Sequence, residues 1–216
     1  MKIQDSSFEY SLEAHGNKEI YKDAIFFDLE HYVYKKPICV GVFGCCYYDD
    51  ELKELKVTQY MIENKDDAVD ILFLIKSYMQ EVYSKYNKKY VVTFSGNNDF
   101  TMINYLFKKY SLNYNLKDYL EEIDLQKEYE KVKKSGIGLK ALEKEFNIVR
   151  DSEVISGSNL AKTFSKIVKD KDYFLRMPKD KINKILLYNE QDVVSLFYIL
   201  VNWNNVIKED EKTSCE

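Results

Sequence analysis

The sequence predicts an α/β fold in which helices flank a mixed central sheet. Strand-like runs crowd the first third of the chain, a further strand lies between two helical segments, and the last third is helical. Strands joined by short turns pair antiparallel, whereas strands reached through a helix pair parallel. We therefore expect antiparallel leading strands followed by parallel ones.

Three β-rich runs lead the chain, at residues 24–30, 38–48 and 52–61. Residues 31–37 separate the first two runs, and their Lys-Lys-Pro sequence predicts a turn. A three-stranded meander is the simplest arrangement of these runs.

Asn64 is expected to cap an amphipathic helix that ends near Tyr86, with Leu72, Phe73 and Tyr78 among its apolar positions. Later in the chain, Ser158 is a candidate helix cap and Pro178 precedes the last helix. The remaining elements are expected, in order, as a strand at 90–94, a helix at 99–110, a strand at 119–125, and helices at 139–146, 158–169 and 179–203.

Length and composition favour one folded domain over residues 1–216, with its core at about 22–203 and with 1–21 and 204–216 peripheral. Hydrophobic residues make up 45% of the chain, which has only 2 Pro and 7 Gly, so its composition argues against disorder. The first twenty residues lack the apolar stretch of a secretory signal, and no run approaches the roughly 20 apolar residues of a membrane span. We expect a soluble cytoplasmic protein without a membrane segment.

Asp and Glu carboxylates are the candidate catalytic and metal-binding groups of this sequence. Cysteines occur at positions 39, 45, 46 and 215 without metal-ligand spacing, so buried reduced thiols are expected. The chain has only two histidines, which argues against a His-rich metal site. The net charge of −4 opposes general attraction to a polyanion, but a local basic patch could still guide one.

Asp28 and Glu30 lie two residues apart in IFFDLE, so a strand would place both on one face. Two carboxylates that share one position need a positive charge nearby. Mg²⁺ or Mn²⁺ can supply it, since these ions prefer hard oxygen ligands. The alternative is that the strand ends there and both acids face water.

Two further segments carry candidate acids. In YNEQDVVSL, Tyr188 and Asp192 are four residues apart and share one face of the last helix, although a solvated Asp beside an interfacial Tyr would look the same. Asp99 follows a predicted strand and a Gly-Asn-Asn turn, where it could also be the N-cap of the next helix. The ordered occurrence of these acids on a strand, a turn and a late helix favours a common site.

With these segments in that order, the sequence resembles the DEDD (DnaQ-like) exonuclease superfamily of the ribonuclease-H-like fold, and within it the YprB-like predicted bacterial nucleases. FFDLE is similar to the first exonuclease motif, VVTFSGNNDF to the second and YNEQDVVSL to the third. The resemblance covers roughly residues 22–201 and includes IDL at 123–125, GLKALEKEFNIVR at 138–150 and Ser156-Gly157. Tyr188, four residues before Asp192, matches the tyrosine subtype.

The resemblance implies a metal-dependent 3′–5′ exonuclease that hydrolyses single-stranded DNA or RNA with two divalent ions, Mg²⁺ or Mn²⁺. Asp28 would bridge both ions, Glu30 and Asp192 would complete the site that generates hydroxide, and Asp99 would hold the second ion through water. Tyr188 would orient the attacking water.

Candidate substrate contacts are cationic. The segment 162–184 holds eight Lys or Arg against three Asp, with aromatic residues between them, as a single-stranded substrate requires; solvated helix faces are the alternative. The candidate substrate-binding residues are Lys140, Arg150, Lys166 and Lys169.

One departure from the motif supports other functions. The second motif usually reads Gly-x-x-Phe-Asp, whereas here Asp99 precedes Phe100. The alternative is therefore a catalytically weakened module that binds nucleic acid or serves as an accessory subunit. Two further alternatives are an endonuclease that uses the same pair of metal ions and a structural protein that binds a partner. The nuclease interpretation would be abandoned, and only the fold prediction kept, if the carboxylates of residues 28 and 192 pointed apart. The same would follow if a salt bridge occupied the place of the metal ions.

Overall fold

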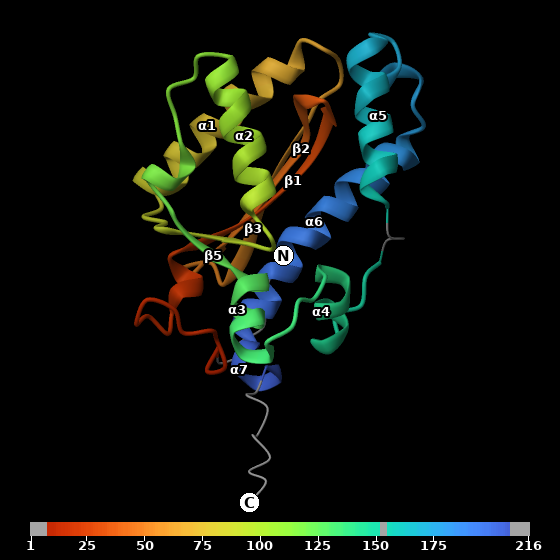
Figure 1. The fold of residues 1–216 in the computed structure, drawn as a ribbon. Coiled ribbons are helices and arrows are strands. Elements are labelled where there is room, and N and C mark those ends of the chain that lie inside the picture. Colours follow the sequence, from red (N-terminus) through yellow and green to blue (C-terminus); the bar gives the residue numbers. More distant parts are fainter. Residues whose placement is uncertain (1–7, 152–154, 208–216) are drawn as a thin grey trace, which may run out of the picture.

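A five-stranded sheet forms the centre of the computed structural model, which describes residues 8–151 and 155–207 (Figure 1). The strand order is β3-β2-β1-β4-β5. β1 pairs antiparallel with β2 and parallel with β4, so the predicted mixed sheet is confirmed. The strands are β1 (Ala24–Tyr34), β2 (Lys36–Asp49), β3 (Glu54–Met61), β4 (Tyr90–Thr93) and β5 (Glu121–Asp124).

The first two strands are longer than predicted. The turn expected over 31–37 is wrong in extent: β1 continues to Tyr34, and only Lys35, with a φ of 57°, separates it from β2. The ladder shifts register between Glu30 and His31, where β2 contributes an extra residue. A second shift lies between Tyr32 and Val33, so pairing continues through residues 31–34 with two irregularities.

Helices cover both faces of the sheet. The described helices are α1 (Asp67–Ser84), α2 (Asn97–Lys109), α3 (Leu125–Lys133), α4 (Leu139–Glu145), α5 (Gly157–Lys169), α6 (Lys179–Val201) and α7 (Trp203–Val206), with 3-10 turns at Ile20–Lys22, Leu116–Asp118 and Phe174–Arg176. α6 crosses the sheet on the side opposite α1 and α2 (Figure 1). Among the described helices, none is both long and apolar enough to cross a membrane.

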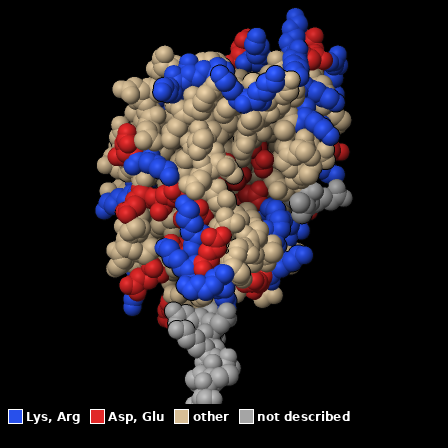
Figure 2. All heavy atoms as spheres, in the orientation of Figure 1, with Lys and Arg blue, Asp and Glu red and all other residues tan. Residues whose placement is uncertain are grey.

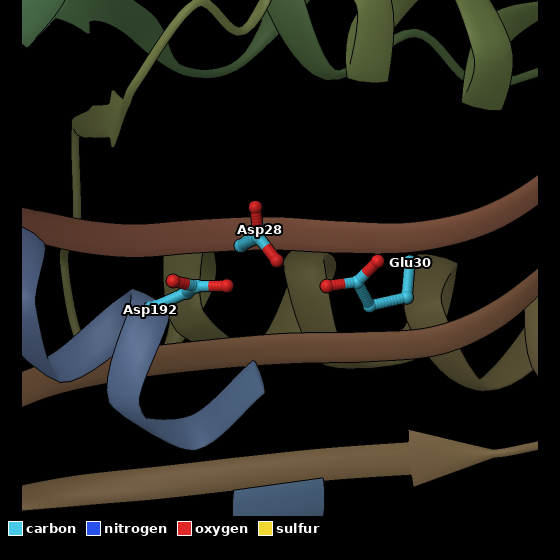
Figure 3. Close-up of side chains that lie close together, drawn as sticks. All are labelled: Asp28, Glu30 and Asp192. Atoms are coloured by element: carbon cyan, nitrogen blue, oxygen red, sulfur yellow. The ribbon is translucent and has the colours of Figure 1, made fainter. Parts of the chain in front are cut away.

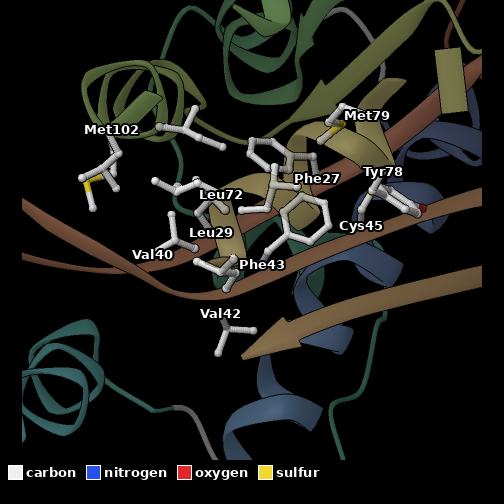
Figure 4. Close-up of a cluster of buried hydrophobic side chains, with 14 of the residues drawn as sticks. Phe27, Leu29, Val40, Val42, Phe43, Cys45, Leu72, Tyr78, Met79 and Met102 are labelled. Atoms are coloured by element: carbon white, nitrogen blue, oxygen red, sulfur yellow. The ribbon is translucent and has the colours of Figure 1, made fainter. Parts of the chain in front are cut away.

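Two clusters of buried side chains hold these layers together, and β1 contributes alternate residues to each. Phe27 and Leu29 join the cluster under α1 and α2 (Figure 4), whereas Ala24 and Phe26 pack with the second half of α6. Asp28 and Glu30 continue the second set, so alternation directs both toward α6. The reduced cysteines expected at 39, 45 and 46 are buried and free, and Cys215 lies outside the described residues.

Several helix details differ from prediction. The chain was expected to become helical after residue 125 but no bounds were given, and the structure has α3 from Leu125 to Lys133. α6 ends at Val201, before the separate turn of α7. The cap of α5 is Ser156 rather than Ser158, because the Ser156 hydroxyl accepts the backbone N–H of Asn159. On α1, Phe73 is exposed, so its expected place in the apolar face is wrong.

Candidate active site

β1 delivers two carboxylates to the face covered by α6. Asp28 lies opposite Gly44 and Glu30 opposite Val42 in the antiparallel ladder with β2. Both side chains are half-buried and point from β1 toward the helix (Figure 3). The bulge that follows Glu30 ends the regular alternation at this point.

α6 supplies the third carboxylate. Asp192 is buried and faces the two acids of β1 (Figure 3). One carboxylate oxygen from each of Asp28, Glu30 and Asp192 lies within 4.8 Å of the other two. The predicted convergence of residues 28 and 192 is therefore present in the structure.

A glycine allows α6 to approach this closely. A Cβ at Gly44 would lie 2.1 Å from Oδ1 of Asn189, a distance that no real contact permits. Asn189 is fully buried and donates its Nδ2 to Oδ2 of Asp28 at 3.0 Å. Its own Oδ1 accepts from Nε2 of Gln59 at 2.8 Å, which fixes the amide orientation. The Gln59–Asn189 pair thus orients the Asp28 carboxylate.

The acids shift one another's ionisation. Burial and the nearby Asp192 carboxylate raise the pKa of Asp28 from 3.8 to about 7. Burial and Asp28 raise the pKa of Glu30 from 4.5 to about 9. These carboxylates therefore cannot all ionise at neutral pH without a positive charge between them. The three carboxylates could hold a divalent metal ion, since hard cations prefer oxygen ligands.

Two cations from the α4 region reach the same site. Lys140 Nζ and Arg150 Nη2 both donate to Oδ1 of Asp192. Arg150 also forms a bidentate pair with Glu143, whose carboxylate is almost fully buried. Lys140 and Arg150, predicted as substrate contacts, are thus partners of a predicted metal ligand.

A salt bridge that occupied the predicted metal site would argue against metal binding, so the position of these ion pairs matters. Both cations contact Asp192 on one oxygen, and within the described residues neither Asp28 nor Glu30 forms an ion pair. The ion pairs therefore engage one edge of the carboxylate cluster, and among the described residues the two β1 acids have no direct ion-pair partner.

Tyr188 lies beside the same cations. Lys140 Nζ is 4.7 Å and the Arg150 guanidinium carbon 5.3 Å from the centre of its ring, so the ring and Asp192 share both positive charges. Burial and the Asp192 carboxylate raise the pKa of Tyr188. Its hydroxyl therefore stays protonated and able to donate a hydrogen bond at neutral pH.

Asp99 lies near the cluster but outside the three-carboxylate group. It belongs to the first turn of α2 and is not the N-cap, because the helix begins at Asn97. Phe100 is buried and packs against Phe27, which fixes the start of α2 on the sheet. Burial and the Asp28 carboxylate raise the pKa of Asp99, and its Oδ1 is 3.9 Å from Nδ1 of His31.

Lys166 and Lys169 lie on α5, away from the carboxylates. Both side chains are exposed, and Nζ of Lys166 is 5.5 Å from the centre of the Tyr173 ring. Figure 2 shows acidic atoms near the middle of the viewed face and a concentration of Lys and Arg over α5. A glycine also positions this helix, since a Cβ at Gly41 would meet the ring of Phe164 at 2.4 Å.

Three polar residues of the site were not anticipated: Asn189, Gln59 and Glu143. Asn189 directly follows Tyr188 and lies three residues before Asp192, so helical spacing alone could have placed it at the site. Glu143 is three residues after Lys140, which is also contact spacing in a helix. Gln59 has no such local signal, because only the tertiary fold brings β3 to α6.

Comparisons with known proteins place the chain in a superfamily. A search among curated proteins finds no match. The family model RNase_H_2, described as RNase_H superfamily, matches residues 25–204. The matched segment runs from β1 to α7 and contains all of the carboxylates described above. The chain therefore belongs to the RNase H superfamily, whose fold is associated with nuclease-type activity on nucleic acid.

Proposed function

We propose that this protein is a metal-dependent nuclease that hydrolyses phosphodiester bonds by a two-metal-ion mechanism. The observation that carries the proposal is the convergence of Asp28, Glu30 and Asp192 within 4.8 Å, with the pKa of the two β1 acids raised. Superfamily membership supports nuclease chemistry in general. The resemblance to the DEDD motifs supports the finer assignment, a 3′–5′ exonuclease of the tyrosine subtype acting on single-stranded DNA or RNA.

The carboxylates would hold the metal. Asp28, Glu30 and Asp192 are the ligands that the geometry favours, and Asp99 would act from the edge of the cluster through water. A bound pair of divalent ions would supply a hydroxide nucleophile and neutralise charge on the reacting phosphate. Asn189 would keep the Asp28 carboxylate in one orientation, which is a positioning role.

Tyr188 and the α4 cations would act on the water and the phosphate. The protonated Tyr188 hydroxyl would orient the attacking water. Arg150 would remain on Asp192, because the buried Glu143 holds its guanidinium from the other side. Lys140 is more exposed, at 31% of its side chain, and would turn from Asp192 to a substrate phosphate.

A second candidate function is a nucleic-acid-binding or accessory module without strong catalysis. The observations that favour it are the position of Asp99 outside the three-carboxylate group and the two cations already on Asp192. Such a module would bind nucleic acid but leave it intact when Mg²⁺ or Mn²⁺ is added.

The test is a nuclease assay on end-labelled single-stranded DNA and RNA with Mg²⁺ or Mn²⁺. Wild type should shorten the substrate stepwise from its 3′ end, Asp28→Asn should abolish cleavage, and Tyr188→Phe should slow turnover while metal binding remains. Asp66→Asn, a matched change at an exposed position, should cleave like wild type.

Each other result of this assay has a defined meaning. Internal cuts would replace the exonuclease assignment with an endonuclease. Intact substrate with wild type would favour the accessory module. Full activity in Asp28→Asn would refute the site.

A further inference from the structure

A basic groove lies between α5 and the first half of α6. Its volume is about 370 Å³, and none of the described residues that line it is acidic. The lysines that line it are Lys162 and Lys166 from α5 and Lys181 and Lys184 from α6. Two buried apolar side chains, Leu160 and Ile185, also line it. We call this feature the α5–α6 lysine groove.

No ion pair neutralises the groove lysines in the part of the chain that the structure describes. Among the described residues, none of the four lies in an ion pair, whereas exposed lysines elsewhere, such as Lys53 and Lys85, have carboxylate partners. Tyr173 lies between the two helices: Lys166 and Lys181 approach its ring at 5.5 and 5.8 Å. The Tyr173 hydroxyl also contacts Nζ of Lys181 at 3.3 Å. An aromatic side chain among uncompensated cations suits a strand of stacked bases and phosphates.

Two lysines of the groove lie on the same stripe of α6 as two residues of the carboxylate site. Lys181, Lys184, Tyr188 and Asp192 are spaced by three, four and four residues, so they follow a single stripe of the helix. At 1.5 Å per residue, Lys184 lies about 12 Å and Lys181 about 17 Å from Asp192 along the axis. A strand with one phosphate at Asp192 would therefore place phosphates a few nucleotides away near these lysines.

We propose that the α5–α6 lysine groove binds the phosphate backbone of single-stranded nucleic acid a few nucleotides from the bond that is cleaved. The inference rests on the proposed function for the identity of the site and adds the path of the substrate. Lysines bind phosphate as point charges and read no base edges, so binding in the groove is independent of sequence.

The test measures binding in EDTA, where no cleavage occurs, by fluorescence anisotropy of a labelled single-stranded 15-mer at several salt concentrations. Lys181→Gln/Lys184→Gln removes two charges from the groove, and Lys53→Gln/Lys85→Gln removes two from lysines outside it. Because each phosphate contact contributes about 0.7 to the salt slope, the groove variant should lower the slope by about 1.4. At 0.1 M salt its affinity should fall roughly 10- to 30-fold, while the control stays near wild type.

A second groove variant, Lys162→Gln/Lys166→Gln, tests the α5 side and should lower the slope in the same way. Equal losses in the groove and control variants would overturn the proposal, because net charge alone would then explain binding. Unchanged binding in both groove variants would overturn it too.

Failure of the proposed function gives a different result. The groove variants would still lose binding in EDTA, but wild type would not cleave with Mg²⁺ or Mn²⁺. Cleavage by wild type with unaltered binding in the groove variants would leave the nuclease and remove only the groove.

Discussion

Replacing Asp28 with Asn should stabilise the protein when divalent ions are absent and the pH is above neutral. Asp28 lies against two other carboxylates, and folding raises its pKa from 3.8 to about 7. The substitution keeps the shape of the side chain and an oxygen that can accept from Asn189. It therefore removes the charge while leaving the hydrogen bond in place.

The magnitude follows from the pKa shift. One pKa unit corresponds to about 1.4 kcal/mol, so the full shift corresponds to about 4 kcal/mol. Because Asp28 is partly exposed and solvent screens its neighbours, we expect Asp28→Asn to raise the free energy of unfolding by about 1–3 kcal/mol. A raised pKa means that the folded state favours the protonated acid, so wild type loses this stability as the pH rises from about 4 to about 7. The advantage of the variant should be complete at about pH 8 and less than half as large at about pH 5.

Urea unfolding in EDTA at these two pH values measures the effect. Asp192→Asn is the informative control, because that carboxylate pairs with Lys140 and Arg150 and its loss should destabilise the protein by about 1–3 kcal/mol. Added Mn²⁺ should raise the stability of wild type but not of Asp28→Asn. An Asp28→Asn protein less stable than wild type at about pH 8 in EDTA would refute the like-charge explanation.

Two further predictions concern the approach of α6 and the protons on the site. Gly44→Ala should destabilise the protein by about 1–3 kcal/mol, measured by thermal unfolding, because the added methyl group clashes with Asn189. Gly138→Ala is the control and should not destabilise it, because a Cβ there meets nothing within 4 Å. Equal stability of the two variants would contradict the packing argument. Affinity for Mn²⁺ should rise about tenfold per pH unit between about pH 7 and about pH 9, where Glu30 must lose its proton to bind, and more steeply below about pH 7, where Asp28 must lose its proton as well. A calorimetric titration that showed no pH dependence would contradict the raised pKa values.

The sheet and the β1 acids could be predicted because their signals are local. Alternation along IFFDLE places Asp28 and Glu30 on one face without reference to the rest of the chain. The order of strands and helices likewise predicted the mixed sheet, which the structure confirms. The family match over residues 25–204 agrees with the superfamily that the motifs suggested.

Features that depend on tertiary contacts were missed or wrong. The β1–β2 ladder continues through residues 31–34 with two register shifts and a one-residue connection at Lys35, and no local pattern signals that. The start of α3 was not located because Asp124 ends β5 and also caps the helix that starts at Leu125. The exposure of Phe73 depends on which side of α1 meets the sheet.

The partners of the site show the same limit. Lys140 and Arg150 are recognisable as cations near a motif, but their approach to Asp192 depends on the fold of the α4 region. The burial of Glu143 beside them is equally a tertiary property. Sequence thus identified the charged groups but not which charge each one neutralises.

Charge balance links these cations to the number of metal ions. The four predicted acids and Glu143 carry five negative charges when ionised, and Lys140 and Arg150 carry two positive charges, which leaves −3. One divalent ion leaves −1, which repels a phosphodiester, whereas a second gives +1 and attracts it. Cleavage should therefore rise with Mn²⁺ concentration with a Hill coefficient above 1, measured from initial rates at fixed substrate. Full activity with a coefficient of 1 would mean that one ion suffices, and Asp99 would then have no role as a ligand.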